Sequence, residues 1–259
     1  MITVNETIIK ILKEIELNED IEIIYACEAG SRAWGFCRKD SDYDIRFIYM
    51  KRNVEDYLSL KSISDVIEYE GDDMDIVGWD IKKAFTLHYK DNPSLREWLM
   101  SDIVYIDRGI SKIFTLNDFD KVVLMNHYSA IAKSHWKRYS GLEFSKKKIK
   151  KYLYVLRSIL CWKLLERDIY PPLKIQELLD HDKINISDEI RRDIRSLIDY
   201  YLDISDIGED AIFRINNFIL RSLDSMKKVK AETSKDFSEY DKRFREFLLS
   251  AGDCDDGEF

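Results

Sequence analysis

The sequence predicts an α/β or α+β domain over residues 1–107, followed by an all-helical domain over residues 108–259. The first part carries four short apolar runs rich in β-branched and aromatic residues, which is typical of strands. The second part repeats its apolar residues at intervals of three and four, as amphipathic helices do. The change of period lies near residue 106, and 259 residues suffice for one large domain or two modest ones.

Four strands and three helix starts are expected in the first part. The strands are predicted over residues 22–27, 43–50, 64–70 and 73–79. Asn5 is expected to cap the helix ETIIKILKEIE and Asp80 the helix IKKAFTLHYK, because a side-chain oxygen there accepts the free amides of the first turn. Asn92-Pro93 predicts a turn between two helices, with Asn92 as the cap of the second.

Helices are expected throughout the second part. Their apolar periodicity places them around residues 117–138, 145–166, 186–203, 210–226 and 235–250. Pro171-Pro172 is expected to separate two of them, because proline ends one helix and suits the beginning of another.

Several protein classes are excluded by what the chain lacks. No apolar run approaches the ~20 residues of a membrane helix, and the first residues do not form a signal peptide, so a cytoplasmic location without a membrane partner is expected. The four cysteines form no CxxC pair and the four histidines have no metal-ligand spacing. We therefore expect reduced thiols and neither a zinc site nor a disulfide framework.

Charge is distributed unevenly along the chain. The net charge is −8, yet residues 132–163 hold ten basic residues against one acidic residue. An acidic part that can hold metal ions is thus joined to a basic segment that can hold phosphates. The alternative is a solvated lysine-rich face, which charge alone favours.

The stretch CEAGSRAWGFCRKDSDYDIRFIYM combines residues suited to phosphate and metal binding. Gly30 lets the backbone approach an anion, amides at the following helix start point toward phosphate oxygens, and Ser31 adds a hydroxyl donor. Asp42 and Asp44 alternate along a strand, so both carboxylates emerge from one face and can ligate divalent cations. Taken alone, DSDYD equally indicates a polar turn before a strand.

The order of strand, Gly-Ser, ten-residue spacer and Asp-x-Asp strand resembles the motif of the DNA polymerase beta-like nucleotidyltransferase superfamily. GSRAWGF, GWDIKKAFTLHYKDNPSLREWLMSDIVY and KKYLYVLRSIL are similar to a prokaryotic and phage branch linked with RNA repair, over about residues 20–175. The resemblance implies a short mixed sheet, two Mg²⁺ ions or Mn²⁺ in their place, and transfer of a nucleoside monophosphate from a triphosphate such as ATP to a hydroxyl.

The superfamily also has a third metal-binding carboxylate on a later strand. Asp75 fits this position, because Met74, Ile76 and Val77 surround it with apolar residues as in the middle of a strand. Asp80 lies where strand gives way to helix, so capping is its better interpretation. Asp75 is expected to help hold the ion that lowers the pKa of the acceptor hydroxyl.

Cationic side chains are candidates for the triphosphate. Arg32 and Arg46 flank the carboxylates. Each is expected to stabilise charge on the phosphates or, alternatively, to pair with nearby acids. Arg32 is the favoured phosphate ligand because it adjoins the Gly-Ser turn. Lys83 follows a predicted helix start, where phosphate contact and plain exposure are equally expected.

A third group of candidates lies in the helical part. Lys150, Tyr154 and Arg157 share one helical face, where a tyrosine ring can stack on a base while the cations meet phosphates. The alternative is an ordinary amphipathic helix with the charges in solvent.

The sequence leaves the acceptor and the oligomeric state open. An RNA end such as that of a damaged tRNA, a protein side chain and a small molecule all remain possible acceptors, and the basic segment favours RNA. A non-catalytic nucleotide-binding or interaction protein on the same fold is the rival hypothesis, against which the intact acidic triad weighs.

Overall fold

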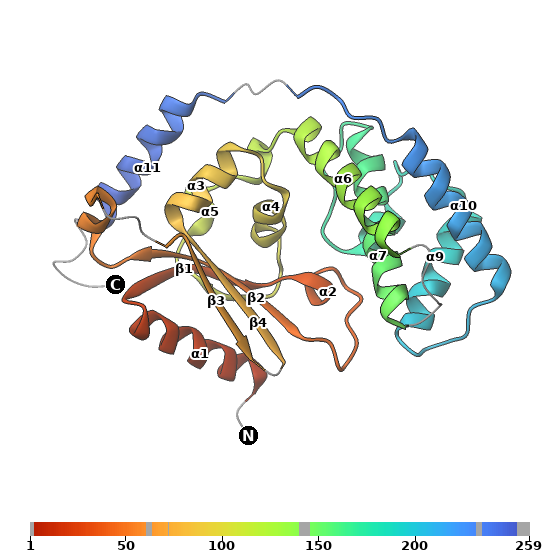
Figure 1. The fold of residues 1–259 in the computed structure, drawn as a ribbon, viewed down its shortest axis with the longest axis horizontal. Helices are drawn as coiled ribbons and strands as arrows, with labels where there is room; N and C mark the ends of the chain where they lie inside the picture. The colour runs from red at the N-terminus through yellow and green to blue at the C-terminus, as the bar shows by residue number, and fades with distance from the viewer. Residues whose placement is uncertain (1–2, 61–63, 72, 140–145, 232–234, 253–259) are drawn as a thin grey trace. The chain divides into compact units, whose positions relative to one another are not determined.

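The computed structural model describes residues 3–60, 64–71, 73–139, 146–231 and 235–252 (Figure 1). The chain forms two compact units. One comprises Met1–Ala33, Ser41–Phe119 and Thr233–Phe259, and the other comprises Trp34–Asp40 and Asp120–Glu232. The units therefore interleave along the chain, and they differ in extent from the contiguous segments 1–107 and 108–259.

A five-stranded mixed sheet forms the centre of the first unit. Its strands are β1 (Ile21–Glu28), β2 (Tyr43–Lys51), β3 (Val66–Gly71), β4 (Met74–Asp80) and β5 (Val104–Asp107). They lie in the order β3-β4-β2-β1-β5, with β2 and β4 parallel and the other pairs antiparallel. The mixed α/β architecture and the first four strands are confirmed, whereas the short edge strand β5 was not predicted.

Helix α1 (Val4–Asn18) covers one face of this sheet (Figure 1). Its buried Ile8, Leu12 and Ile15 belong to the same apolar cluster as Ile45 and Phe47 of β2. The cap is Thr3, whose hydroxyl accepts from the Glu6 amide while the Glu6 carboxylate accepts from the Thr3 amide. The expectation that Asn5 caps this helix was therefore wrong, because the reciprocal Thr3 and Glu6 pair starts the helix earlier and leaves Asn5 inside it.

The opposite face carries α3 (Ile81–Tyr89) and α4 (Pro93–Leu99). Asp80 caps α3 through the Lys82 amide at 2.8 Å, and Asn92 caps α4 through the Leu95 amide at 3.0 Å, so both predicted caps are confirmed. The remaining short elements of this unit are α2 (Gly30–Ala33), η1 (Val54–Leu58), α5 (Ile110–Ile113) and η2 (Leu116–Asp118).

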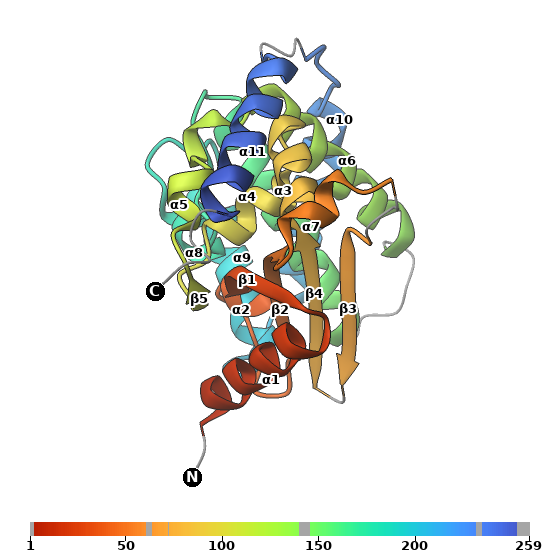
Figure 2. The same ribbon diagram turned by 90° about the vertical axis from the view of Figure 1, so that its left-hand side faces the viewer.

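The C-terminal helix α11 (Phe237–Gly252) packs beside α3 in the first unit (Figure 2). The Lys235 ammonium lies 2.6 Å from the Asp91 carboxylate, and the Tyr240 hydroxyl lies 2.9 Å from His88 Nδ1. Asp91 and His88 are buried. Polar contacts between groups withdrawn from water thus fix the start of this helix.

The second unit is helical and centred on α7 (Lys146–Leu165). Helices α6 (Lys121–Tyr139), α8 (Ile175–Asp180), α9 (Asp188–Tyr201) and α10 (Glu209–Ser225) contact α7. The predicted helical segments are confirmed, and α8 is additional. Within the described parts of the chain, no helix is both long and apolar enough to cross a membrane.

Candidate active site

Two of the three predicted carboxylates lie side by side on the parallel strands β2 and β4. Asp44 of β2 and Asp75 of β4 are register partners, so their side chains leave the same face of the sheet. Their side chains are 24% and 47% exposed. Two acidic groups in adjacent positions on one sheet face form the centre of the candidate site.

Gly30 brings the Gly-Ser turn against Asp44. Its φ is +57°, and a Cβ placed on it would lie 1.9 Å from Asp44 Oδ2, so only glycine allows this approach. The Ala29 amide donates to the Asp44 carbonyl at 2.8 Å, which ties the turn to the start of β2. Ser31 follows in the turn and is buried. The structure thus brings together Gly30, Ser31 and Asp44, as the motif predicts.

Glu28 is a buried residue of this site that the sequence analysis missed. Its carboxylate accepts from the Asp44 amide at 2.8 Å and from the Tyr105 hydroxyl at 2.5 Å. Burial raises the pKa of Glu28, while the bonds from Tyr105 and Asp44 lower it. A carboxylate at the end of the apolar strand IEIIYACE was the available signal. Glu28 therefore orients the backbone of Asp44.

Arg46, not Arg32, contacts the paired carboxylates. Arg46 donates to Asp75 Oδ2 at 2.7 Å and to Asp44 Oδ1 at 3.3 Å. Arg32 instead donates to the carbonyls of Ser41 and Asp42, and its guanidinium stacks 3.7 Å from the centre of the Tyr43 ring. Arg32 thus links the Gly-Ser turn to the residues that precede β2. Its contact with phosphate stays a prediction.

Asp42 lies just before β2 and is exposed. Among the described residues, no group of three or more His, Cys, Asp or Glu side chains converges on a point that suits a metal ion. The oxygens of Asp44 and Asp75 nevertheless suit a hard divalent cation. The absence of a Cβ at Gly30 leaves the space that the Asp44 carboxylate occupies beside the turn. Two carboxylates are thus available to such an ion, and its binding stays a prediction, because the structure does not bring Asp42 together with Asp44 and Asp75.

Asp80 and Lys83 lie at the other end of β4, and the strand separates Asp75 from Asp80 by roughly 17 Å at ~3.3 Å per residue. Asp80 is buried and accepts from the Tyr57 hydroxyl at 2.8 Å. Lys83 forms an ion pair with Asp65 at 3.0 Å beside a groove of about 510 Å³. The geometry therefore places Asp75, and not Asp80, beside Asp44, and it does not bring Lys83 to the carboxylates.

The side chains of Tyr154 and Arg157 pack inside the helical unit. Arg157 is 3% exposed, donates to the Leu173 carbonyl at 3.1 Å and lies over the Trp34 ring at 4.4 Å. Tyr154 contacts the Trp34 ring edge-on at 5.0 Å. Lys150 is half-buried on the same helix. The contacts of Tyr154 and Arg157 support the packing alternative, and their roles toward a nucleotide stay predictions.

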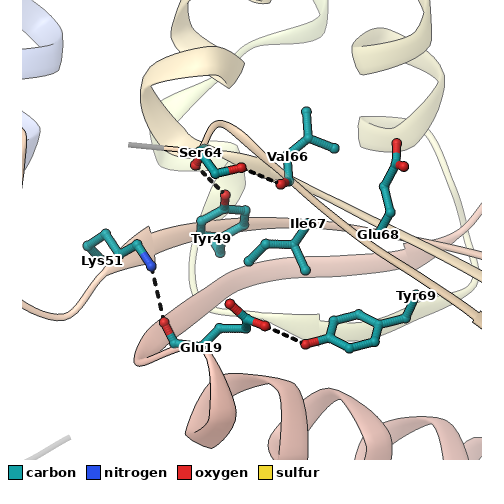
Figure 3. Close-up of a pocket in the computed structure, with 8 residues that line it drawn as sticks. All are labelled: Glu19, Tyr49, Lys51, Ser64, Val66, Ile67, Glu68 and Tyr69. Atoms are coloured by element: carbon teal, nitrogen blue, oxygen red, sulfur yellow. Dashed lines mark hydrogen bonds between the residues drawn. The ribbon is translucent and has the colours of Figure 1, made fainter. Parts of the chain in front are cut away.

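A separate cavity of about 270 Å³ lies near the far end of β2 (Figure 3). In it the Tyr69 hydroxyl donates to Glu19, the Tyr49 hydroxyl to the Ser64 carbonyl, and the Lys51 ammonium to the Glu19 carbonyl. Because its main polar groups bind one another, this cavity offers a ligand few partners and is not the candidate site.

The known proteins similar to this chain include one family, one bacterial relative and one solved structure. Residues 4–249 match the model of a family described as the RNA repair pathway DNA polymerase beta family. The chain is 37% identical over 239 residues to the uncharacterized protein YcgL of Bacillus subtilis (strain 168), covering 88% of this chain and 90% of that protein. A crystal structure of a nucleotidyltransferase-like protein from Exiguobacterium sibiricum 255-15 aligns with 14% identity and a TM-score of 0.31, covering 86% of this chain and 74% of that one.

Proposed function

The chain belongs to the RNA repair pathway DNA polymerase beta family, and on that premise we propose that it is a metal-dependent nucleotidyltransferase acting on RNA ends. In the proposed reaction a nucleoside monophosphate passes from a nucleoside triphosphate, ATP in the first instance, to a hydroxyl acceptor. The observation that carries the proposal is the register pairing of Asp44 with Asp75 beside the close approach of Gly30.

The residues of the site divide into two sets. Gly30 and Ser31 would hold the β and γ phosphates, with Arg32 beside them. Asp42 and Asp44 would hold two Mg²⁺ or Mn²⁺ ions, and Asp75 would hold one of them. When bound, these ions neutralise phosphate charge and lower the pKa of the acceptor hydroxyl. A phosphate contact for Lys83 and a nucleotide contact for Tyr154 and Arg157 stay predictions, because in this structure Lys83 pairs with Asp65, Tyr154 contacts Trp34 and Arg157 donates to the Leu173 carbonyl.

The proposed step is an in-line substitution at the α-phosphorus. A bond forms between the acceptor oxygen and the α-phosphorus, the bond from that phosphorus to the bridging oxygen breaks, and pyrophosphate leaves. The hydroxyl proton passes to a carboxylate of the site or to water. Positioning by Gly30, Asp44 and Asp75 and neutralisation of charge account for the catalysis.

An RNA end is the acceptor that two observations favour. The family description names an RNA repair pathway, and residues 132–163 carry a net charge of +9. In this segment Lys137 and Arg138 are exposed at the end of α6, where they can meet phosphates of an RNA backbone, and Lys150 is half-buried on α7. Steep weakening of binding with salt is the expected signature.

The test uses each α-labelled nucleoside triphosphate with Mg²⁺ and either total RNA or total protein. The wild-type chain should label RNA, and Asp42→Asn, Asp44→Asn and Asp75→Asn should each reduce labelling by about 10²-fold or more while leaving the unfolding midpoint unchanged. Asp73→Asn is the matched control, because Asp73 is an exposed carboxylate just before β4.

Full labelling by the Asp44 and Asp75 variants would contradict the proposed site. Labelling of protein in place of RNA would contradict the acceptor only. Nucleotide binding that ignores Mg²⁺, with no pyrophosphate released from any triphosphate, would favour a non-catalytic nucleotide-binding protein.

A further inference from the structure

Arg46 occupies a fixed position between the two paired carboxylates. One terminal nitrogen donates to the carbonyls of Ile45 at 3.0 Å and of Asp75 at 2.7 Å. The other donates to Asp44 Oδ1 and Asp75 Oδ2. The Arg46 side chain is only 16% exposed. Two backbone carbonyls therefore hold the guanidinium, and its remaining nitrogen is directed at the carboxylates.

We propose that Arg46 is a positioning residue that makes divalent-cation binding depend on the nucleotide. It would hold Asp44 and Asp75 together in the free protein, and it would weaken the binding of a cation that arrives without a nucleoside triphosphate. This inference rests on the proposed function, because it concerns the same carboxylates.

The charges of the three side chains explain why a cation alone should bind weakly. Asp44 and Asp75 together carry a formal charge of −2, and Arg46 reduces it to −1. A divalent cation is attracted by that remaining charge, and it also meets the repulsion of a guanidinium bonded to both of its ligands. The hydrogen bonds from Arg46 to the carbonyls of Ile45 and Asp75 keep the guanidinium from moving away from the two carboxylates.

The charge of the nucleotide explains why a triphosphate should strengthen cation binding. A triphosphate brings several negative charges to the Gly30 turn, which lies against Asp44. Those charges offset the guanidinium, so a cation and a nucleotide should each strengthen the binding of the other. Arg46 thereby strengthens the coupling between the two binding events.

The experiment measures Mn²⁺ binding to the whole chain by electron paramagnetic resonance, with and without an ATP analogue whose α,β-bridge is a methylene group. Arg46→Met removes the charge, and Arg46→Lys keeps the charge but loses the two-carbonyl geometry. Arg52→Met is the matched control, because Arg52 follows the same strand and its side chain is 50% exposed in a loose pair with Asp20. Binding of Mn²⁺ to the analogue in solution is the same in every sample that contains the analogue.

Arg46→Met should bind Mn²⁺ alone at least about tenfold more tightly than wild type, and the analogue should improve its Mn²⁺ affinity by a smaller factor than in wild type. Arg46→Lys should lie closer to wild type, and Arg52→Met should match it. Unchanged or weaker Mn²⁺ binding by Arg46→Met would overturn the inference while leaving the proposed function intact. Absence of Mn²⁺ binding by the wild type, even with the analogue, would remove both.

If Arg46→Met does not fold, Arg46→Gln gives the same measurement, since the glutamine side chain is polar but carries no charge. The circular dichroism spectrum and the unfolding midpoint of each variant are recorded first. A Gln variant that folds and binds Mn²⁺ no more tightly than wild type would also overturn the inference.

Discussion

Gly30→Ala tests whether the close approach of the Gly-Ser turn to Asp44 is required for the site. The new Cβ would lie 1.9 Å from Asp44 Oδ2, whereas contacts shorter than 3.0 Å are essentially never seen. The carboxylate or the turn must therefore move by about 1 Å. Gly109→Ala is the matched control, because its φ of +90° is also left-handed but its Cβ would meet only Lys112, at 3.6 Å.

The two variants should differ in stability by a small amount and in activity by a large one. Both place a Cβ in the left-handed region, at about 1–2 kcal/mol. Gly30→Ala also disturbs the partly exposed pair of Asp44 with Arg46, which adds at most about 1 kcal/mol. Misplacing the carboxylate by about 1 Å should reduce nucleotidyl transfer by about 10²-fold, whereas Gly109→Ala should leave transfer near the wild-type rate.

The free energy of unfolding is measured by urea titration, and transfer by release of labelled pyrophosphate. The stability measurement is repeated in an Asp44→Ala background, which removes the contacts with Oδ2 and Cγ and leaves only the Cβ of residue 44, at 3.2 Å, so most of the extra cost of Gly30→Ala should disappear. Equal stability of Gly30→Ala and Gly109→Ala, together with full transfer by Gly30→Ala, would refute the reasoning.

Two further predictions concern the attachment of α11. Burial lowers the pKa of His88 from 6.5 to about 4. Between these two pH values His88 is therefore protonated in the unfolded chain and neutral in the native chain. The free energy of unfolding should therefore fall by about 3 kcal/mol as pH decreases from about 6.5 to 4. Urea titrations should show a flatter pH dependence for His88→Gln, and an unchanged one would count against this assignment. Lys235→Met removes the ammonium from buried Asp91 and should cost about 3–5 kcal/mol, whereas Arg245→Met, in an exposed pair with Asp241, should cost below about 0.5 kcal/mol. Equal losses in the two variants would contradict the importance of burial.

Local chemistry made much of the first unit predictable. Asp80 and Asn92 cap helices because their side-chain oxygens are one or two atoms from the backbone and meet amides of the next turn. The cap of α1 was misplaced because Asn5 and Thr3 are both acceptable caps, and Glu6 decides between them through its return bond to Thr3. Strand β5 has only four residues, and its pairing with β1 decides its conformation more than its own apolar pattern.

The partners of the site residues were less predictable than the residues themselves. Glu28 and Tyr105 are 77 positions apart in the chain, and no local pattern indicates that their side chains meet. Arg157 shares a helical face with Lys150 and Tyr154, yet its contacts with Trp34 and Leu173 are set by a segment and a loop that join α7 only in the folded unit. The periodicity of a sequence shows which residues share one face of a helix, but it does not show which segment packs against that face.

By itself the sequence determined the fold class, through its change of apolar period, and it determined the Gly30-Ser31 turn and the places of Asp44 and Asp75 on strands, because these follow from backbone conformation within a few residues. The tertiary structure alone decided that Asp75 stands beside Asp44, that Arg46 lies between them, and that residues 34–40 fold with the helical unit. The physical reason is that strand register and burial depend on contacts between segments distant in the chain.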